Sequence, residues 1–272
     1  MTDMNKQLLV CLISALVFAT PSYAASTDSC NDADTVLALH ADGVDASTTF
    51  TDSSTSGKTV TANGNAQIDT AQYKFATASG LFDGTDDFLS TPDHADFQFG
   101  SGDFTIDMWV RWNSLPSDTT NQALFSKWNV AGSDKEIVLY INNTSGTYTL
   151  YSLWSANGTS LTEVISGASF AVSTGVWYHV AVIRSGTSGM LFIDGTQSGS
   201  TTDVTGFSMY DGAASVYVGN IIDDGFDFNG WMDEVRIVKG TAVWTTTFTA
   251  PAAAYEDTCV SARRRQGQIV GD

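Results

Sequence analysis

The chain is poor in basic side chains: only 12 of its 272 residues are lysine or arginine, against 30 aspartates and glutamates. The formal net charge is therefore −18 at neutral pH. Nucleic acids and anionic membrane surfaces are bound through clusters of Lys and Arg, so this composition argues against both as partners. An acidic chain suits a soluble protein, and acidic loops can also hold a divalent cation.

Long apolar segments are equally scarce, and the one that stands out lies at the start of the chain. Lys6 precedes an apolar run from Leu8 to Ala19, which is too short to cross a bilayer. Pro21 ends the run, and small residues follow up to Ala24. This order predicts a signal peptide over residues 1–24, cleaved after Ala24. We therefore expect a secreted protein, extracellular or periplasmic, whose mature chain does not insert into a membrane.

Cysteine is rare as well. Cys11 lies inside the predicted signal peptide, so the mature chain keeps only Cys30 and Cys259, one near each end. In an oxidising compartment an even pair that flanks the whole domain predicts a disulfide. The chain also lacks a nucleophile elbow, a phosphate-binding glycine loop and the Cys and His spacing of a zinc site.

Helical periodicity is absent after residue 24, and the chain has only 4 prolines. Short runs of alternating apolar and polar residues are separated instead by Gly, Ser, Thr, Asn and Asp. In residues 104–112 the apolar side chains from Phe104 to Trp112 occupy every second position. Asp194-Gly195 predicts a tight hairpin turn. The pattern predicts an all-β, antiparallel two-sheet sandwich in one domain, residues 25–259, followed by a disordered basic tail at 260–272.

The last predicted strand, Gly230–Lys239, carries the sequence Gly-Trp-Met-Asp-Glu-Val-Arg-Ile-Val-Lys. Strict alternation places Asp233 on the same face as Val235 and Ile237. A carboxylate on an otherwise apolar face needs a partner, either a backbone donor or a metal.

Several blocks, taken in order, resemble the laminin-G-like domains of the concanavalin A-like lectin and glucanase superfamily. The resemblance spans roughly residues 35–251 and rests on residues 37–43, 82–88, 102–110, 175–182, 191–195 and the Asp-Glu-Val-Arg-Ile segment of the last strand. It implies a two-sheet jelly roll whose first and last strands are adjacent. That arrangement agrees with a disulfide between Cys30 and Cys259.

The superfamily includes glucanases, so hydrolysis of a β-glucan is one alternative. Retaining glycosidases need two carboxylates close together, and the laminarinase group takes them from a Glu-x-Asp-x-x-Glu motif. The nearest segment here, around Asp107, has Thr105 and Val110 where the two glutamates would stand. We therefore expect no catalytic residues and no enzymatic activity.

A structural calcium ion is a further expectation from the resemblance. Related sandwich modules hold calcium between their first and last strands, which implies Asp233 as a ligand and Asp42 as a second one. The alternative is that these aspartates only stabilise turns through their own backbone.

The binding role that we expect is toward a carbohydrate or a surface glycoprotein, as in a lectin or an adhesin. Aromatic rings pack well against the apolar faces of sugars, and four of them are predicted in loop-rich segments: Trp128, Tyr210, Phe226 and Phe228. Tyr151 and Trp154 are further candidates, but they point to opposite faces of one strand. The alternative is a structural extracellular protein with no small ligand. The sequence leaves the ligand, the oligomeric state and the role of Arg263–Arg265 open.

Overall fold

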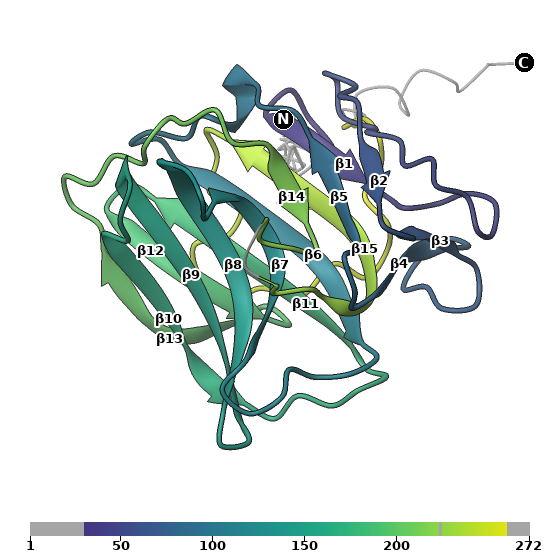
Figure 1. Cartoon of the computed structure of the whole chain (residues 1–272). Coiled ribbons are helices and arrows are strands. Elements are labelled where there is room, and N and C mark those ends of the chain that lie inside the picture. Colours follow the sequence, from purple (N-terminus) through teal and green to yellow (C-terminus); the bar gives the residue numbers. More distant parts are fainter. Residues whose placement is uncertain (1–29, 223–224, 260–272) are drawn as a thin grey trace, which may run out of the picture.

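The computed structural model describes residues 30–222 and 225–259. The predicted signal peptide with its cleavage site and the predicted basic tail lie outside the described residues. Two antiparallel sheets stack face to face, with the strands of the seven-stranded sheet in front of the eight-stranded sheet in Figure 1. The predicted all-β sandwich is confirmed. In the described part of the chain no helix is long and apolar enough to cross a membrane.

The eight-stranded sheet contains, in spatial order, β13 (Thr196–Asp203), β12 (Ser188–Ile193), β11 (Trp177–Ser185), β6 (Phe104–Trp112), β15 (Asn229–Lys239), β4 (Ser79–Asp83) and β3 (Gln67–Asp69), and β1 (Thr35–Leu39) also pairs with β15. The seven-stranded sheet contains β10 (Glu163–Phe170), β9 (Thr147–Gly158), β8 (Asp134–Thr144), β7 (Asn121–Asn129), β14 (Val216–Val218), β5 (Phe88–Thr91) and β2 (Thr61–Asn63). A 3-10 turn, η1 (Ala95–Phe97), follows β5.

The space between the sheets is filled by side chains from alternate positions of the strands. The predicted alternation of β6 is confirmed, because its residues from Phe104 to Trp112 at every second position all lie in the core. Trp154 of β9 is fully buried in the same core, in contact with Phe104. The Asp194-Gly195 hairpin is also confirmed, with φ values of 49° and 76°.

The alternation of β15 is broken, and the prediction that Asp233, Val235 and Ile237 share a face was wrong. The register shifts between Asp233 and Arg236, where Glu234 adopts a left-handed φ of 53°. This β-bulge inserts one residue into the strand. As a result Val235 and Ile237 lie in the core, whereas Asp233 pairs with Trp109 on the outside of the sheet.

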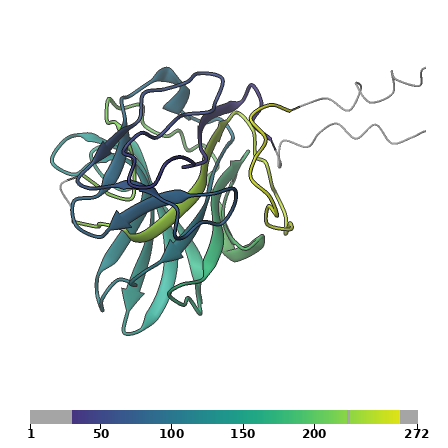
Figure 2. The same cartoon turned by 90° about the vertical axis from the view of Figure 1, so that its right-hand side faces the viewer.

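After β15 the chain crosses the outside of the eight-stranded sheet; we call residues 241–255 the C-terminal strap, visible as the yellow segment along one side of the sandwich in Figure 2. Trp244 and Phe248 stack on each other with ring centroids 4.0 Å apart, and both lie edge-on to His179 of β11. Beyond the strap, the predicted disulfide between Cys30 and Cys259 is present and joins positions 229 residues apart.

Candidate functional site

The outside of the seven-stranded sheet carries a row of three aromatic rings, Tyr151, Tyr140 and Phe226, which we call the aromatic row. Tyr151 of β9 and Tyr140 of β8 are directly opposite in register, with ring centroids 5.6 Å apart and an interplanar angle of 22°. The Phe226 ring follows at 6.2 Å from Tyr140. All three side chains are half-buried, so each ring is partly exposed to solvent.

Strand alternation explains why these rings face outward. Leu139 and Ile141 flank Tyr140 and lie in the core, so Tyr140 must point away from it. Leu150 places Tyr151 outside in the same way. Phe226 is held on this face because its carbonyl oxygen accepts a 2.8 Å hydrogen bond from the Ala123 amide of β7.

A small apolar cluster supports the aromatic row on the outside of the sheet. Its buried members are Ala123, Trp128, Val138 and Ile221. Leu153 packs against this cluster, and the neighbouring Val164 of β10 is 41% exposed. The rings therefore rest on a rigid sheet that already excludes water from beneath them.

A row of polar groups runs parallel to the aromatic row, two residues along the same strands. Asn121, Asn142 and Thr149 occupy neighbouring positions on β7, β8 and β9. The Asn142 amide donates to Asn121 Oδ1 at 2.8 Å. Residues two apart on a strand share a face, so the amides and the hydroxyl lie beside the rings.

The burial of Tyr140 also changes its chemistry. Burial, reinforced by the neighbouring Tyr151, raises the pKa of Tyr140 to about 12. Its hydroxyl is therefore neutral at physiological pH and can both donate and accept a hydrogen bond. The surface thus offers apolar faces and neutral hydrogen-bonding groups side by side.

The four aromatic residues predicted to bind ligand have different positions. Phe226 belongs to the aromatic row. Trp128 is not in a loop but on β7 beneath the row, 8% exposed, with the Lys135 ammonium 5.7 Å from its ring centroid. Tyr210 lies at the end of the same sheet, where its amide donates to the Ser155 carbonyl.

Phe228 contradicts the prediction, because its side chain is fully buried in the core. It packs edge-on against Phe82 of β4 and Trp112 of β6, both in the eight-stranded sheet. Its amide donates to the Gly219 carbonyl, which draws the start of β15 inward. Phe228 therefore contributes to the core and cannot contact a ligand.

Tyr140 was missed in the sequence, although a signal for it was present. The apolar residues Ile137, Leu139 and Ile141 alternate, which places Tyr140 on the opposite face of the same strand. The stacking of Tyr140 on Tyr151 depends on the register between β8 and β9, and this register cannot be predicted from the sequence of either strand alone.

Asp233 and Asp42, the predicted calcium ligands, lie near each other beside the eight-stranded sheet. Asp233 Oδ2 accepts hydrogen bonds from the amides of Lys74 at 2.8 Å and Phe75 at 3.0 Å, and Asp42 Oδ1 accepts one from Thr77. Asp233 Oδ1 is buried with no hydrogen-bond partner among the described residues. Burial, with further contributions from Glu234 and Asp42, raises the pKa of Asp233 to about 7.

The described residues contain no group of three or more His, Cys, Asp or Glu side chains that could share a metal ion. A calcium ion at Asp233 would therefore need backbone carbonyls and water for most of its ligands.

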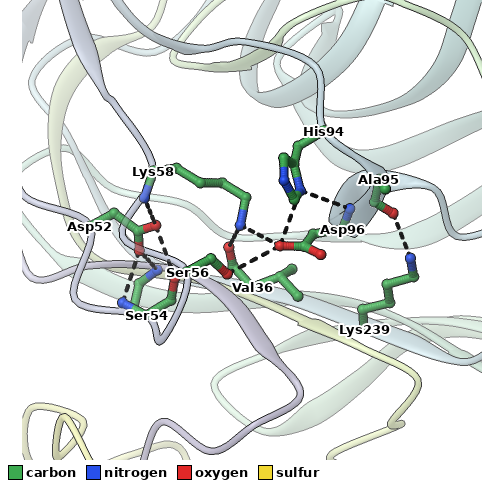
Figure 3. A network of polar contacts seen from close by, with 10 residues as sticks. Val36, Asp52, Ser54, Ser56, Lys58, His94, Ala95, Asp96 and Lys239 are labelled. Atoms are coloured by element: carbon green, nitrogen blue, oxygen red, sulfur yellow. Dashed lines mark hydrogen bonds and ion pairs between the residues drawn. The ribbon is translucent and has the colours of Figure 1, made fainter.

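A second polar site lies at the other end of the sandwich, where the loop around Lys58 meets η1 (Figure 3). Lys58 Nζ donates to the Val36 carbonyl and to Asp96 Oδ2, both at 2.7 Å, and His94 Nδ1 lies 3.2 Å from the same Asp96 oxygen. A cavity of about 260 Å³ opens beside Lys58 and His94. The Lys58 ammonium is paired within this network, so the site carries no unsatisfied charge for a ligand.

The comparisons with known proteins concern the family and the fold. Residues 83–245 match the sequence profile of the Laminin G 3 family, described as the concanavalin A-like lectin/glucanases superfamily. The chain belongs to this family. No curated protein sequence matches the chain.

Solved structures with a similar fold include three structures of two binding domains. The binding domain of Paraclostridial Mosquitocidal Protein 1 is 14% identical with a TM-score of 0.59, over 77% of this chain and 50% of that chain. The binding domain of botulinum neurotoxin DC in complex with rat synaptotagmin II is 16% identical, with a TM-score of 0.58, over 77% and 49%. The same domain in complex with SialylT is 17% identical, with a TM-score of 0.56, over 77% and 49%.

The laminin-G-type chain spans about half the length of the chains in these three structures. At such low identity the likeness shows a shared fold and nothing finer.

Because the superfamily contains glucanases as well as lectins, the position of Asp107 matters. Asp107 lies on the outside of the eight-stranded sheet, fully buried beneath the C-terminal strap. The Arg236 Nε atom donates to it at 3.0 Å, His179 Nε2 lies 3.2 Å away, and the Tyr255 hydroxyl also donates to it. Burial alone would raise the pKa of Asp107, but Arg236 and His179 bring it below the ordinary value. A carboxylate held in this way supports the sheet and has no open face for a substrate.

Proposed function

We propose that this chain is an exported, non-catalytic module that binds carbohydrate on the outside of its seven-stranded sheet, through the aromatic row. The observation that carries the proposal is the unbroken succession of Tyr151, Tyr140 and Phe226, each half-exposed and in contact with the next. The parallel row of Asn121, Asn142 and Thr149 lies beside the rings and supplies hydrogen-bonding groups.

The chemistry of sugars fits such a surface. One face of a pyranose ring is lined with C–H groups and packs on an aromatic ring, while its equatorial hydroxyls exchange hydrogen bonds with amides and hydroxyls. A flat row on a sheet suits an extended stretch of a glycan chain more than a terminal sugar. Affinity should be weak, because a shallow surface buries little area and much of the gain is lost to ordering the ligand.

Export is part of the same proposal and rests on the predicted signal peptide ending at Ala24. The disulfide between Cys30 and Cys259 supports it, because such bonds persist in oxidising compartments. N-terminal sequencing of the exported protein tests it: a chain that begins at Ala25 is expected, and one that begins at Met1 would contradict the proposal.

Hydrolysis is not favoured, because the chain lacks a Glu-x-Asp-x-x-Glu motif and Asp107 is buried in an ion pair. The similar toxin domains are named as binding domains, which makes glycans and glycoproteins the first ligands to test. The named ligands belong to those proteins, and the chemistry of the aromatic row is the reason to expect a glycan here.

A glycan array with the purified chain, followed by titration of the best glycan, tests the proposal. Tyr151→Ala and Tyr140→Ala should each weaken binding. Tyr73→Ala serves as the matched control, since Tyr73 is 48% exposed and lies next to Lys74 and Phe75, which contact the other sheet. An array without any hit would favour the structural-protein alternative, and release of reducing ends from a β-glucan would favour the hydrolase.

We also propose a structural calcium ion at Asp233, with Asp42 beside it. The partnerless Oδ1 of Asp233 motivates the proposal. A cation bound only by the folded chain raises the melting temperature by mass action. The melting temperature should therefore be higher in calcium than in chelator, and Asp233→Asn should remove the difference. Equal melting temperatures in calcium and in chelator would contradict the site.

A further inference from the structure

Lys127 is a buried lysine near the end of β7, and its side chain has no exposed surface. Its ammonium donates to Glu136 Oε2 on the neighbouring strand β8, which is buried to the same degree, and to the Gly212 carbonyl oxygen at 2.7 Å. Asp93, two residues after β5, is the third neighbour: its Oδ1 lies 3.1 Å from Lys127 Nζ. We call Lys127, Glu136 and Asp93 the Lys127 triad.

The Lys127 triad is separate from the aromatic row and is not used by the proposed carbohydrate site. Taking an ammonium and a carboxylate out of water is costly, and a buried pair is often no more stable than an apolar pair of the same size. Packing alone therefore gives no reason for a charged pair at this position. The arrangement instead brings an amine, a carboxyl group and an acid–base residue together, with the amine and the acid–base residue shielded from water.

Glu136 has the properties of a proton carrier. Burial raises the pKa of Glu136 to about 7, although Lys127 opposes the shift, and the nearby Asp211 adds to it. Its Oε1 is buried with no hydrogen-bond partner among the described residues. A carboxyl group that is half protonated near neutral pH can take a proton from one atom and return it to another.

We propose that Lys127 Nζ and the Asp93 carboxyl group join spontaneously in an intramolecular amide bond, with Glu136 moving the protons. The amine is held in contact with the carboxyl group by the fold itself, which removes the entropy cost of bringing the two together. The Gly212 carbonyl fixes the direction of the nitrogen.

The reaction balances without any other reagent. Glu136 takes one proton from the Lys127 ammonium, and the freed electron pair on nitrogen attacks Asp93 Cγ. The N–C bond forms, and a second proton leaves the nitrogen by the same route. Both protons pass to one Asp93 oxygen, the C–O bond breaks, and water departs. One ammonium and one carboxylate become one neutral amide and one water, and Glu136 ends as it began.

Asp93, and not Glu136, is the carboxyl group that reacts. The Asp93 side chain is 28% exposed, so the water that is released has a path to solvent, whereas Glu136 has no exposed surface. The bond would also connect separate parts of the sheet, because β14 lies between β5 and β7. An amide between Lys127 and Glu136 would only join two strands that already pair.

Intact mass spectrometry of the purified, reduced and denatured chain is the first test. Relative to the mass calculated from its determined N-terminus, the wild type should be lighter by one water molecule. Asp93→Ala should have its full calculated mass. Asp203→Ala is the matched control: Asp203 is an exposed acid at the end of β13 in the other sheet, and this variant should lose water as the wild type does. Glu136→Gln should retain its full mass, or react far more slowly.

Peptide mapping locates the bond, because a succinimide at an Asp-Gly step causes the same loss of mass. Trypsin does not cleave after an acylated lysine, so residues 75–111 and 112–135 should appear as one branched peptide that links Asp93 to Lys127. A wild type at its full calculated mass overturns the proposal. So does a loss of water that persists in Asp93→Ala or maps to a different pair of residues.

Discussion

The two sheets of the sandwich use aromatic and polar residues on their outer faces in opposite ways. On the eight-stranded sheet, Asp107, His179 and Arg236 are buried beneath the C-terminal strap, and Tyr255 closes the network. On the seven-stranded sheet, Tyr140 and Tyr151 remain half-exposed. The outward-facing polar and aromatic side chains of the eight-stranded sheet therefore contribute to packing, because the strap covers them. The tyrosines of the seven-stranded sheet are not covered and can contact a ligand.

The largest expected effect concerns the covered face. Arg236→Met should destabilise the protein by about 3–5 kcal/mol, because Asp107 would remain buried without its cation. Urea unfolding measures the loss. Arg111→Met is the matched control, since the Arg111 guanidinium lies over the half-exposed Trp231 ring, 4.7 Å from its centroid, and should cost about 1 kcal/mol or less. Equal losses for the two variants would contradict the covered network.

The disulfide should have the next largest effect. It closes a loop of 229 residues, for which the chain-entropy model allows about 5 kcal/mol. We expect replacement of Cys30 and Cys259 by serine to lower the free energy of unfolding by about 2–4 kcal/mol, because measured effects of a disulfide are often smaller than the chain-entropy value. Urea unfolding of the double variant beside the wild type measures it. An unchanged urea midpoint would mean that the other contacts of the C-terminal strap keep this segment in place without the disulfide.

The dependence of stability on pH comes from the covered side of the molecule as well. His40 lies 2.8 Å from Glu234 and 2.9 Å from Asp257, and the hydrogen bond to Glu234 is the main reason why its pKa rises to about 9, against the effect of burial. Its contribution to stability is complete below its ordinary pKa of 6.5 and is lost as the pH rises through 9.

Asp233 acts in the same direction. Without a bound cation its pKa is raised from 3.8 to about 7, so between these values the folded state binds more protons than the unfolded state, and stability falls as the pH rises. Together with Glu136, whose pKa burial also raises to about 7, these two groups predict that stability in chelator declines steadily from pH 5 to pH 9. Unfolding measured across that range tests this, and His40→Gln should flatten the upper part. A stability that increases over the range would contradict both assignments.

The smallest effect on stability, and the largest on binding, is expected on the open face. Tyr151→Ala should change the free energy of unfolding by less than about 1 kcal/mol, because the ring is half in solvent already. An aromatic contact contributes about 0.5–1.5 kcal/mol, so binding to a glycan should weaken roughly two- to tenfold. Melting curves and a glycan titration of the same sample separate the two effects.

Much of the covered architecture could be predicted from local patterns. The alternation from Phe104 to Trp112 identifies the core-facing side of that strand without any knowledge of its partner strands. The Asp194-Gly195 pair predicts its hairpin turn because both residues tolerate the positive φ that the turn requires. The pairing of Cys30 with Cys259 follows from there being only two cysteines in the expected mature chain.

What the sequence did not reveal depends on contacts between distant segments. The bulge at Glu234 places a non-glycine residue at positive φ, and the contacts of its carboxylate with His40 and the Tyr255 amide help to hold it there. The aromatic row arises because β8 and β9 pair in one register, and a shift by one residue would separate Tyr140 from Tyr151.

The central claim is that the open face binds glycan and the covered face does not. Titration of the best array glycan with three proteins tests it: the wild type, Tyr140→Ala on the open face, and Trp177→Ala in the covered sheet, where the half-buried Trp177 begins β11 and pairs with Arg111 of β6. The account predicts weaker binding for Tyr140→Ala and wild-type binding for Trp177→Ala. Wild-type binding by Tyr140→Ala together with a loss in Trp177→Ala would contradict it.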